Sequence, residues 1–145
     1  MKSKFHALAG SIALICISIF WASTLYVELT GSHVAIAAVK GNILWGMAIL
    51  IPSMMAVGGS GFSLGAKWKS KVVSAKKVRM KIIAANGMLI LLPSAIFLAQ
   101  WASADMFDTR FYIVQGLEML AGATNITLLS LNMRDGLAIR AKKKR

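Results

Sequence analysis

Four long apolar stretches, separated by charged or polar segments, constrain this sequence more than any other feature. They cover residues 5–29, 34–64, 82–101 and 111–133. Each is long enough to cross a hydrocarbon core of roughly 30 Å, which takes about 20 residues in an α-helix. The sequence therefore predicts one all-α domain over residues 1–145: a bundle of four transmembrane helices, followed by a basic tail at residues 134–145.

Composition places the chain among membrane proteins. Hydrophobic residues make up 57% and charged residues only 15%, whereas soluble domains carry about 25% charged residues. Cys16 has no second cysteine with which to form a disulfide. Residues 1–25 resemble a signal peptide, but no good small-x-small cleavage site follows them, and we expect the first helix to be retained.

The basic residues predict the orientation. Of the 17 lysines and arginines, fifteen fall at Lys2 and Lys4, at residues 67–81 and at residues 134–145. By the positive-inside rule, both termini and the loop that contains Trp68 face the cytoplasm. Charge clustered beside apolar helices favours lipid headgroups as the partner. The net charge of +12 is therefore not interpreted as nucleic-acid binding.

Three ionisable residues lie within the apolar stretches at a similar depth, in the outer third of the bundle. Glu28 closes the first helix, and Lys40 and Glu118 each lie two turns into theirs. Lys40 is expected to pair with Glu118, with Glu28 or with both. The cluster is either a structural clasp that fixes helix register or a proton or substrate site.

A second set of residues converges on the cytoplasmic side and predicts a site for haem b. His6 is the candidate axial ligand, because haem iron takes His, with His or Met as a common second ligand. Met80, Met133 or His6 of a second copy are the alternatives for that second ligand. Gly10, Gly58, Gly59 and Gly61 would give the ring room, and Arg79 and Arg134 would bind the propionates. The opposing interpretation is ordinary packing and a helix-end turn.

His33 cannot complete this site within one chain. It lies 27 residues from His6, or about 40 Å along a helix, on the opposite side of the membrane. His33 is an outer ligand, a proton handler or an interfacial residue without a special role. An odd number of ligands favours a homodimer that shares the site.

Residues 40–53 and 81–94 echo each other. They read KGNILWGMAILIPS and KIIAANGMLILLPS, and seven of the fourteen positions are identical. Chance and an inverted repeat both explain this echo. The shared prolines, Pro52 and Pro93, predict a bend in each helix.

Several short motifs carry a resemblance to a group of small four-helix bacterial inner-membrane proteins. They are HALAG at residues 6–10, Lys40 with Trp45-Gly46, GGSGF at 58–62, Arg79-Met80, FYIVQGLE at 111–118 and NMRDG at 132–136. More loosely, the chain is similar to compact membrane b-type cytochromes. That similarity implies electron transfer with quinone or another redox protein, as an electron carrier or membrane oxidoreductase. The alternatives are a small proton-coupled transporter that uses Glu118, Lys40 and Glu28, and an accessory subunit without a cofactor.

Overall fold

The protein, described here from a computed structural model, is all-helical, as its sequence predicts. The model describes residues 2–65 and 70–143, so the Trp68 loop lies outside the described residues. The described part contains no strand. Its elements are α1 (Lys2–Thr30), α2 (His33–Gly65), α3 (Lys71–Asn86), the π-helical segment η1 (Gly87–Leu91), α4 (Leu92–Ser103) and α5 (Thr109–Lys143).

The elements α3, η1 and α4 follow one another without a break and form one long helical rod. Pro93 lacks an N–H, and its ring clashes with the carbonyl one turn earlier. The chain accommodates this proline with a wider turn, in which the Leu92 N–H donates to the Gly87 carbonyl five residues before it. Pro52, in contrast, lies inside an unbroken α2. The two echoing segments therefore differ in backbone structure.

Two helices extend further than their apolar stretches predict. The third begins at Lys71 rather than at residue 82, because Ser70 caps it: the Ser70 Oγ accepts a hydrogen bond of 3.2 Å from the Val73 N–H. The fourth continues through the predicted basic tail to Lys143. Hydropathy marks only the apolar part of a helix, whereas lysine and arginine are themselves good helix formers.

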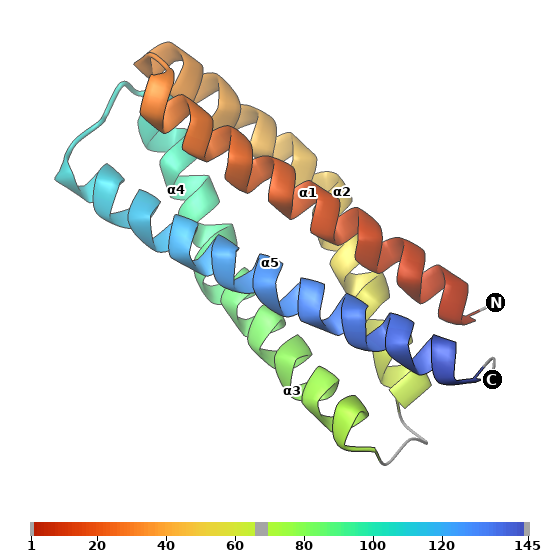
Figure 1. Ribbon diagram of the computed structural model, residues 1–145. Coiled ribbons are helices and arrows are strands. Elements are labelled where there is room, and N and C mark those ends of the chain that lie inside the picture. Colours follow the sequence, from red (N-terminus) through yellow and green to blue (C-terminus); the bar gives the residue numbers. More distant parts are fainter. Residues whose placement is uncertain (1, 66–69, 144–145) are drawn as a thin grey trace.

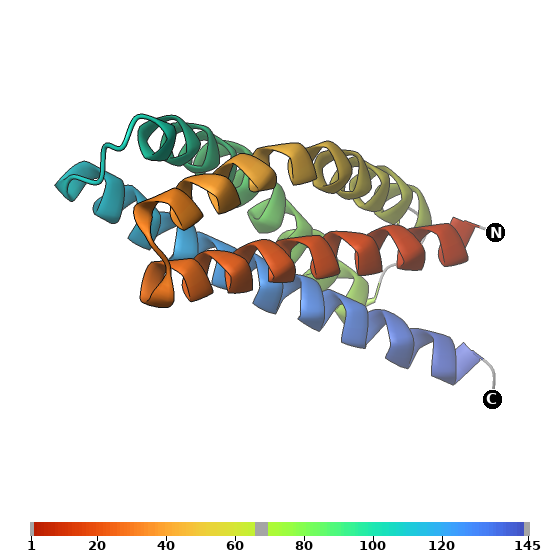
Figure 2. The ribbon, with the colours of Figure 1, turned by 90° about the horizontal axis from the view of Figure 1, so that it is seen from above.

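The four long helical rods form a closed ring. Helix α1 packs between α2 and α5, α2 packs on α4, and α3 and α4 pack on α5. The first turn of α1, the last turns of α2 and α5, and the start of α3 lie at one end, which we call the terminal end (Figures 1 and 2). The α1–α2 turn and the α4–α5 connection lie at the other end, which we call the loop end.

The protein has the surface of a membrane protein. Helices α1 and α2 and the α3–α4 rod are each long and apolar enough to cross a membrane. Large apolar side chains face outward, with Trp45 82% exposed, Phe62 77% and Leu89 76%. The interior, in contrast, includes the buried polar residues Thr24, Lys40, Ser94, Gln115, Asn125 and Asn132. A soluble protein distributes these residue types the other way round.

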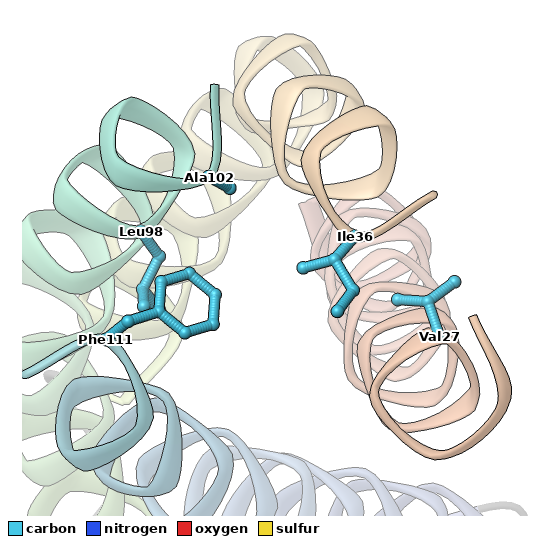
Figure 3. Packing of buried hydrophobic residues seen from close by; sticks show 5 residues of the cluster. All are labelled: Val27, Ile36, Leu98, Ala102 and Phe111. Carbon is cyan, nitrogen blue, oxygen red and sulfur yellow. The ribbon is translucent and has the colours of Figure 1, made fainter. Parts of the chain in front are cut away.

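A hydrophobic cluster closes the bundle near the loop end. Leu98 and Ala102 of α4 and Phe111 of α5 lie on one side of the cluster. They face Val27 of α1 and Ile36 of α2 on the other side (Figure 3). Leu98 and Phe111 are fully buried. A second cluster, formed by Ile17 of α1, Ile83 of α3 and Leu129 of α5, lies nearer the terminal end. Polar side chains occupy the interior between and beyond these two clusters.

Candidate functional site

The most distinctive interior feature is a buried ion pair. Lys40 Nζ of α2 lies 2.5 Å from Glu118 Oε2 of α5, and their side chains are 1% and 12% exposed. Gln115 Nε2, one turn before Glu118, donates to the same oxygen at 3.1 Å. Lys40 thus has one of the two partners that the sequence predicts. A charge at this depth needs such a partner, since burying it alone is very costly.

Glu28 is the third member of the cluster, but one of its carboxylate oxygens has no hydrogen-bond partner there. It lies near enough to Lys40 and Glu118 for their charges to act on it. Its Oε1 atom is nevertheless buried with no hydrogen-bond partner, and the same is true of Gln115 Oε1. The cluster therefore holds two acceptor oxygens that nothing in the described part of the chain satisfies.

His33 connects this cluster to the loop end. Its charge also acts on Glu28, and its Nδ1 lies 3.4 Å from Asp105 Oδ1. The imidazole stacks on Phe107 with ring centroids 3.9 Å apart. The His33 side chain is 57% exposed. A titratable group thus lies between the buried carboxylates and the surface.

One face of α5 carries a polar stripe toward the terminal end. Gln115, Glu118, Asn125 and Asn132 recur at intervals of three and seven residues, which places them on one side of a helix. The three amide side chains are buried. From residue 115 to residue 132 the stripe is about 25 Å long at about 1.5 Å per residue, most of the thickness of a hydrocarbon core.

The middle of the stripe meets the π-helical segment. Asn86 Nδ2 donates to Asn125 Oδ1 and to the Ala121 carbonyl, both at 2.8 Å. Asn125 Nδ2 donates in turn to the Ile83 carbonyl at 3.3 Å. The segment η1 begins directly after Asn86, at Gly87, which faces Asn125. Wider turns of this kind are frequent at functional sites.

At the terminal end the stripe finishes in a second ion pair. Arg79 Nη1 of α3 donates to Asp135 Oδ2 at 2.6 Å and to Asn132 Oδ1 at 3.4 Å. Arg134 Nη2 approaches the other Asp135 oxygen at 3.5 Å. The hydrogen bond from Arg79 holds the pKa of Asp135 below its usual value. Lys76 lies close enough to Asp135 and to His6 for its charge to act on both.

His6 lies against the glycine-rich end of α2, as the sequence predicts. Its Nδ1 is 2.9 Å from Ser60 Oγ, and Ser60 donates its own proton to the Ala56 carbonyl. The His6 Nδ1 must therefore be the donor, which leaves Nε2 free as an acceptor. Gly61 gives the imidazole room, because a Cβ at that position would lie 3.1 Å from His6 Cε1, a tight contact.

The other residues of the predicted haem site differ in their surroundings. A Cβ at Gly10 would meet Val57 at 3.9 Å, and Gly58 and Gly59 have no such neighbours within 4 Å. Met80 packs against the cluster of Ile17, Ile83 and Leu129. Arg79 is bound to Asp135, and Arg134 is 71% exposed beside it. No group of three or more metal-binding side chains occurs among the described residues.

Two cavities accompany these sites. A pocket of about 50 Å³ lies directly inward of Glu118, and its lining includes Thr24, Trp21 and Gly122. It is large enough for a water molecule, whose share of liquid volume is about 30 Å³. An open groove of about 420 Å³ runs between α2 and α4 beside Pro52. The groove is apolar and is lined by no histidine, so it offers nothing to the predicted haem ligand.

Sequence reasoning missed several members of these sites. Gln115, Asn125, Ser60, Lys76 and Asp135 all take part, although none was singled out as a site residue. The steps of three and seven residues that relate Gln115 and Asn125 to Glu118 on α5 are a signal that would have found these two. No protein-family model, curated protein or solved structure matches the chain.

Proposed function

We propose that this protein is a small proton-coupled transporter of a bacterial inner membrane, with four spans and both termini in the cytoplasm. The observation that carries the proposal is the buried Lys40–Glu118 pair, with the unsatisfied Glu28 carboxylate beside it, on a polar stripe that crosses the bundle. Ionisable groups inside a membrane are typical of proton relays and substrate pathways.

The charges of the cluster suggest how it works. With all three groups ionised, Glu28, Lys40 and Glu118 sum to one negative charge. A proton on Glu118 neutralises that carboxylate and weakens its hold on the Lys40 ammonium. Lys40 then turns toward Glu28, whose Oε1 atom has no partner. Loss of the proton from Glu118 restores the first arrangement, so Lys40 alternates between two carboxylates.

The proton also needs a route on each side of the cluster. Toward the loop end, exposed His33 lies near Glu28. Toward the terminal end, the small pocket beneath Glu118 is followed along α5 by the Asn86–Asn125 pair and then by Asn132. Asn132 Nδ2 is itself buried without a partner, so this part of the stripe retains a free hydrogen-bond donor.

The orientation rests on charge. The terminal end carries the basic residues Lys71, Lys76, Lys77, Lys81, Arg134 and Arg140, and the positive-inside rule assigns this end to the cytoplasm. Helix α5, with its 35 residues, has one face that is more polar than any face of the other three rods. It becomes the fourth span because that face lies inside the bundle, against α1, α3 and α4.

Proton flux into liposomes tests the proposal. Purified protein is reconstituted into vesicles that contain a pH-sensitive dye, and an inward proton gradient is applied. We expect flux from the wild type and none from Glu118→Gln, which keeps the shape of the side chain but cannot release a proton. Asp108→Asn, at an exposed carboxylate that caps α5, is the matched control and should conduct normally. Equal flux from Glu118→Gln and the wild type would overturn the proposal.

One observation favours a second candidate, the b-type haem protein that moves electrons. The hydrogen bond from His6 Nδ1 to Ser60 leaves Nε2 unprotonated, which is how metal-ligating histidines are commonly held. The second ligand would be Met80, Met133 or the His6 of a second copy in a homodimer. This candidate predicts a Soret band in the oxidised and dithionite-reduced spectra that His6→Ala abolishes. A colourless wild-type protein contradicts it.

A further inference from the structure

Trp45 of α2 is an outward-facing tryptophan at an unusual depth. Its side chain is 82% exposed, more than any other large apolar side chain of the described residues. It lies 12 residues after the start of α2 at His33 and 20 residues before its end at Gly65, or about 18 Å and 30 Å along the helix. A hydrocarbon core of roughly 30 Å centred on α2 therefore surrounds this side chain. Tryptophan is otherwise enriched at the membrane–water interface.

The ring N–H of Trp45 needs an acceptor at this depth. Trp21 of α1 meets the same need within the chain, because its ring N–H donates to the Met119 carbonyl at 2.9 Å. Within residues 2–65 and 70–143, no side-chain or backbone oxygen accepts a hydrogen bond from Trp45. Lipid tails offer no acceptor either, so the N–H stays unsatisfied at a considerable cost. Its partner has to come from outside this chain.

One turn further along α2, a backbone acceptor lacks its donor. Pro52 has no N–H, so the Ala48 carbonyl loses the hydrogen bond that the fourth residue after it supplies in a regular helix. Ser53 does not replace this bond, because its Oγ donates to the Ile49 carbonyl at 2.8 Å. Ala48 and Pro52 both line the open groove of about 420 Å³ between α2 and α4. The acceptor therefore lies beside a hollow in the outer surface.

We propose that this face of α2 binds a second copy of the chain, and that each Trp45 N–H donates to the Ala48 carbonyl of the other copy. Trp45, Ala48 and Pro52 lie on one side of α2, because residues three and seven apart share a side of a helix. A two-fold axis beside that side makes the contact self-complementary. Donor and acceptor are then satisfied twice, and the contact depends neither on proton transport nor on a cofactor.

The rest of this face has the spacing of a packed helix pair. Its members follow one another in alternating steps of four and three residues: Gly41, Trp45, Ala48, Pro52, Met55, Gly59 and Phe62. Two helices pack along a shared seam at this spacing, and membrane helices commonly do so at crossing angles of about +20°. Trp45 and Phe62 project from the seam, whereas a Cβ at Gly41 or Gly59 would meet nothing within 4 Å. Large and small positions therefore alternate along the seam.

A lipid molecule covers the same face without satisfying it. An acyl chain has neither a donor for the Ala48 carbonyl nor an acceptor for the Trp45 N–H. The polar headgroups lie near the helix ends, of which the nearer is about 18 Å from Trp45 along α2. A second copy that crosses the membrane in the same orientation, in contrast, carries both missing groups at the required depth.

Self-association is measured by sedimentation equilibrium of the purified full chain in density-matched detergent. We expect the wild type to dimerise. Trp45→Phe keeps an aromatic ring but loses the N–H, and the loss of two hydrogen bonds per dimer should raise the dissociation constant about tenfold. Ala48→Leu narrows the groove and should raise it as well. Tyr112→Phe, which removes a hydroxyl from an exposed aromatic residue of α5, is the matched control and should leave it unchanged.

Cysteine cross-linking locates the interface. In a chain whose Cys16 is replaced by serine, Met55→Cys on the seam is compared with Leu89→Cys, which lies at an exposed position of η1. Oxidation in membranes should give disulfide-linked dimers from Met55→Cys only. Melting curves check that the variants fold, and if Ala48→Leu does not, Trp45→Phe decides. A monomeric wild type, an unchanged dissociation constant in Trp45→Phe, or dimers only from Leu89→Cys would overturn the inference, because lipid or another protein then covers this face.

Discussion

Replacing Lys40 with methionine tests how much the bundle depends on its buried ammonium. The substitution keeps most of the side-chain volume but leaves Glu118, 12% exposed, without its ion partner. The carboxylate then has to take up a proton. At pH 7 this costs about 3.7 kcal/mol, because free glutamic acid has a pKa near 4.3 and each unit is worth about 1.36 kcal/mol. Removing one partner of a buried pair costs about 3–5 kcal/mol in other proteins.

We therefore expect Lys40→Met to lower the free energy of unfolding by about 3–4 kcal/mol at pH 7. Reversible unfolding in detergent, followed by tryptophan fluorescence, measures it. The folded variant holds one proton on its carboxyl group at position 118. The unfolded chain does not hold this proton at any pH above the pKa of a free glutamic acid. The loss should therefore shrink by about 1.4 kcal/mol for each unit of pH below 7, until that pKa is reached.

Two controls make the result specific. Lys81→Met changes the exposed lysine at the equivalent position of the echoing segment, and should stay within about 0.5 kcal/mol of the wild type. Lys40→Met/Glu118→Met removes both charges and should recover at least half of the loss, since apolar replacements of buried pairs are often neutral. A loss below about 1 kcal/mol, or one that does not vary with pH, would refute the reasoning.

Three further outcomes follow from the structure. Asp135→Asn should destabilise the protein above about pH 4. The difference in stability from the wild type should vanish as pH falls through the pKa of Asp135, which Arg79 lowers. Melting curves across acidic pH check this, and a difference that stays constant would contradict it. Gly122→Ala should cost about 1–3 kcal/mol, because its Cβ would lie 3.0 Å from a Trp21 ring that is fixed by a hydrogen bond to the Met119 carbonyl. Gly116→Ala, with open space at its Cβ, should be neutral or stabilising, and equal effects from the two variants would count against this packing. Asn125→Leu should reduce proton flux because it interrupts the α5 stripe, whereas Thr124→Leu on the exposed side should not; flux that survives in Asn125→Leu would remove the stripe from the pathway.

The depth of polar residues in the apolar stretches predicted much of the site. Glu28, Lys40 and Glu118 were expected at one level, and the structure brings Lys40 and Glu118 into contact. The same reasoning placed His6 beside the glycine-rich end of α2. Depth follows from counting residues along a helix, and a four-helix topology then determines which side chains share a level.

The inward face of each helix was harder to predict. Helices α1 and α2 are apolar around their whole circumference, so no periodicity tells their inner side from their lipid side. Trp21, for example, lies in the apolar α1 and donates a hydrogen bond from its ring N–H to the Met119 carbonyl of α5. Gly58 and Gly59, which were expected to face a cofactor, have open space at their Cβ positions. The wider turn at Gly87–Leu91 also escaped prediction, because Pro52 has a similar sequence around it and yet lies in a continuous α-helix.

Infrared difference spectroscopy tests most directly whether Glu118 exchanges a proton inside the membrane. Spectra of the reconstituted protein are recorded in acidic and in alkaline buffer and subtracted. We expect a carboxylic-acid C=O band in the acidic state that is absent from Glu118→Gln and unchanged in Asp108→Asn. A difference spectrum with no band that depends on Glu118 would mean that the Lys40–Glu118 pair is a fixed structural clasp, and proton-coupled transport through it would be contradicted.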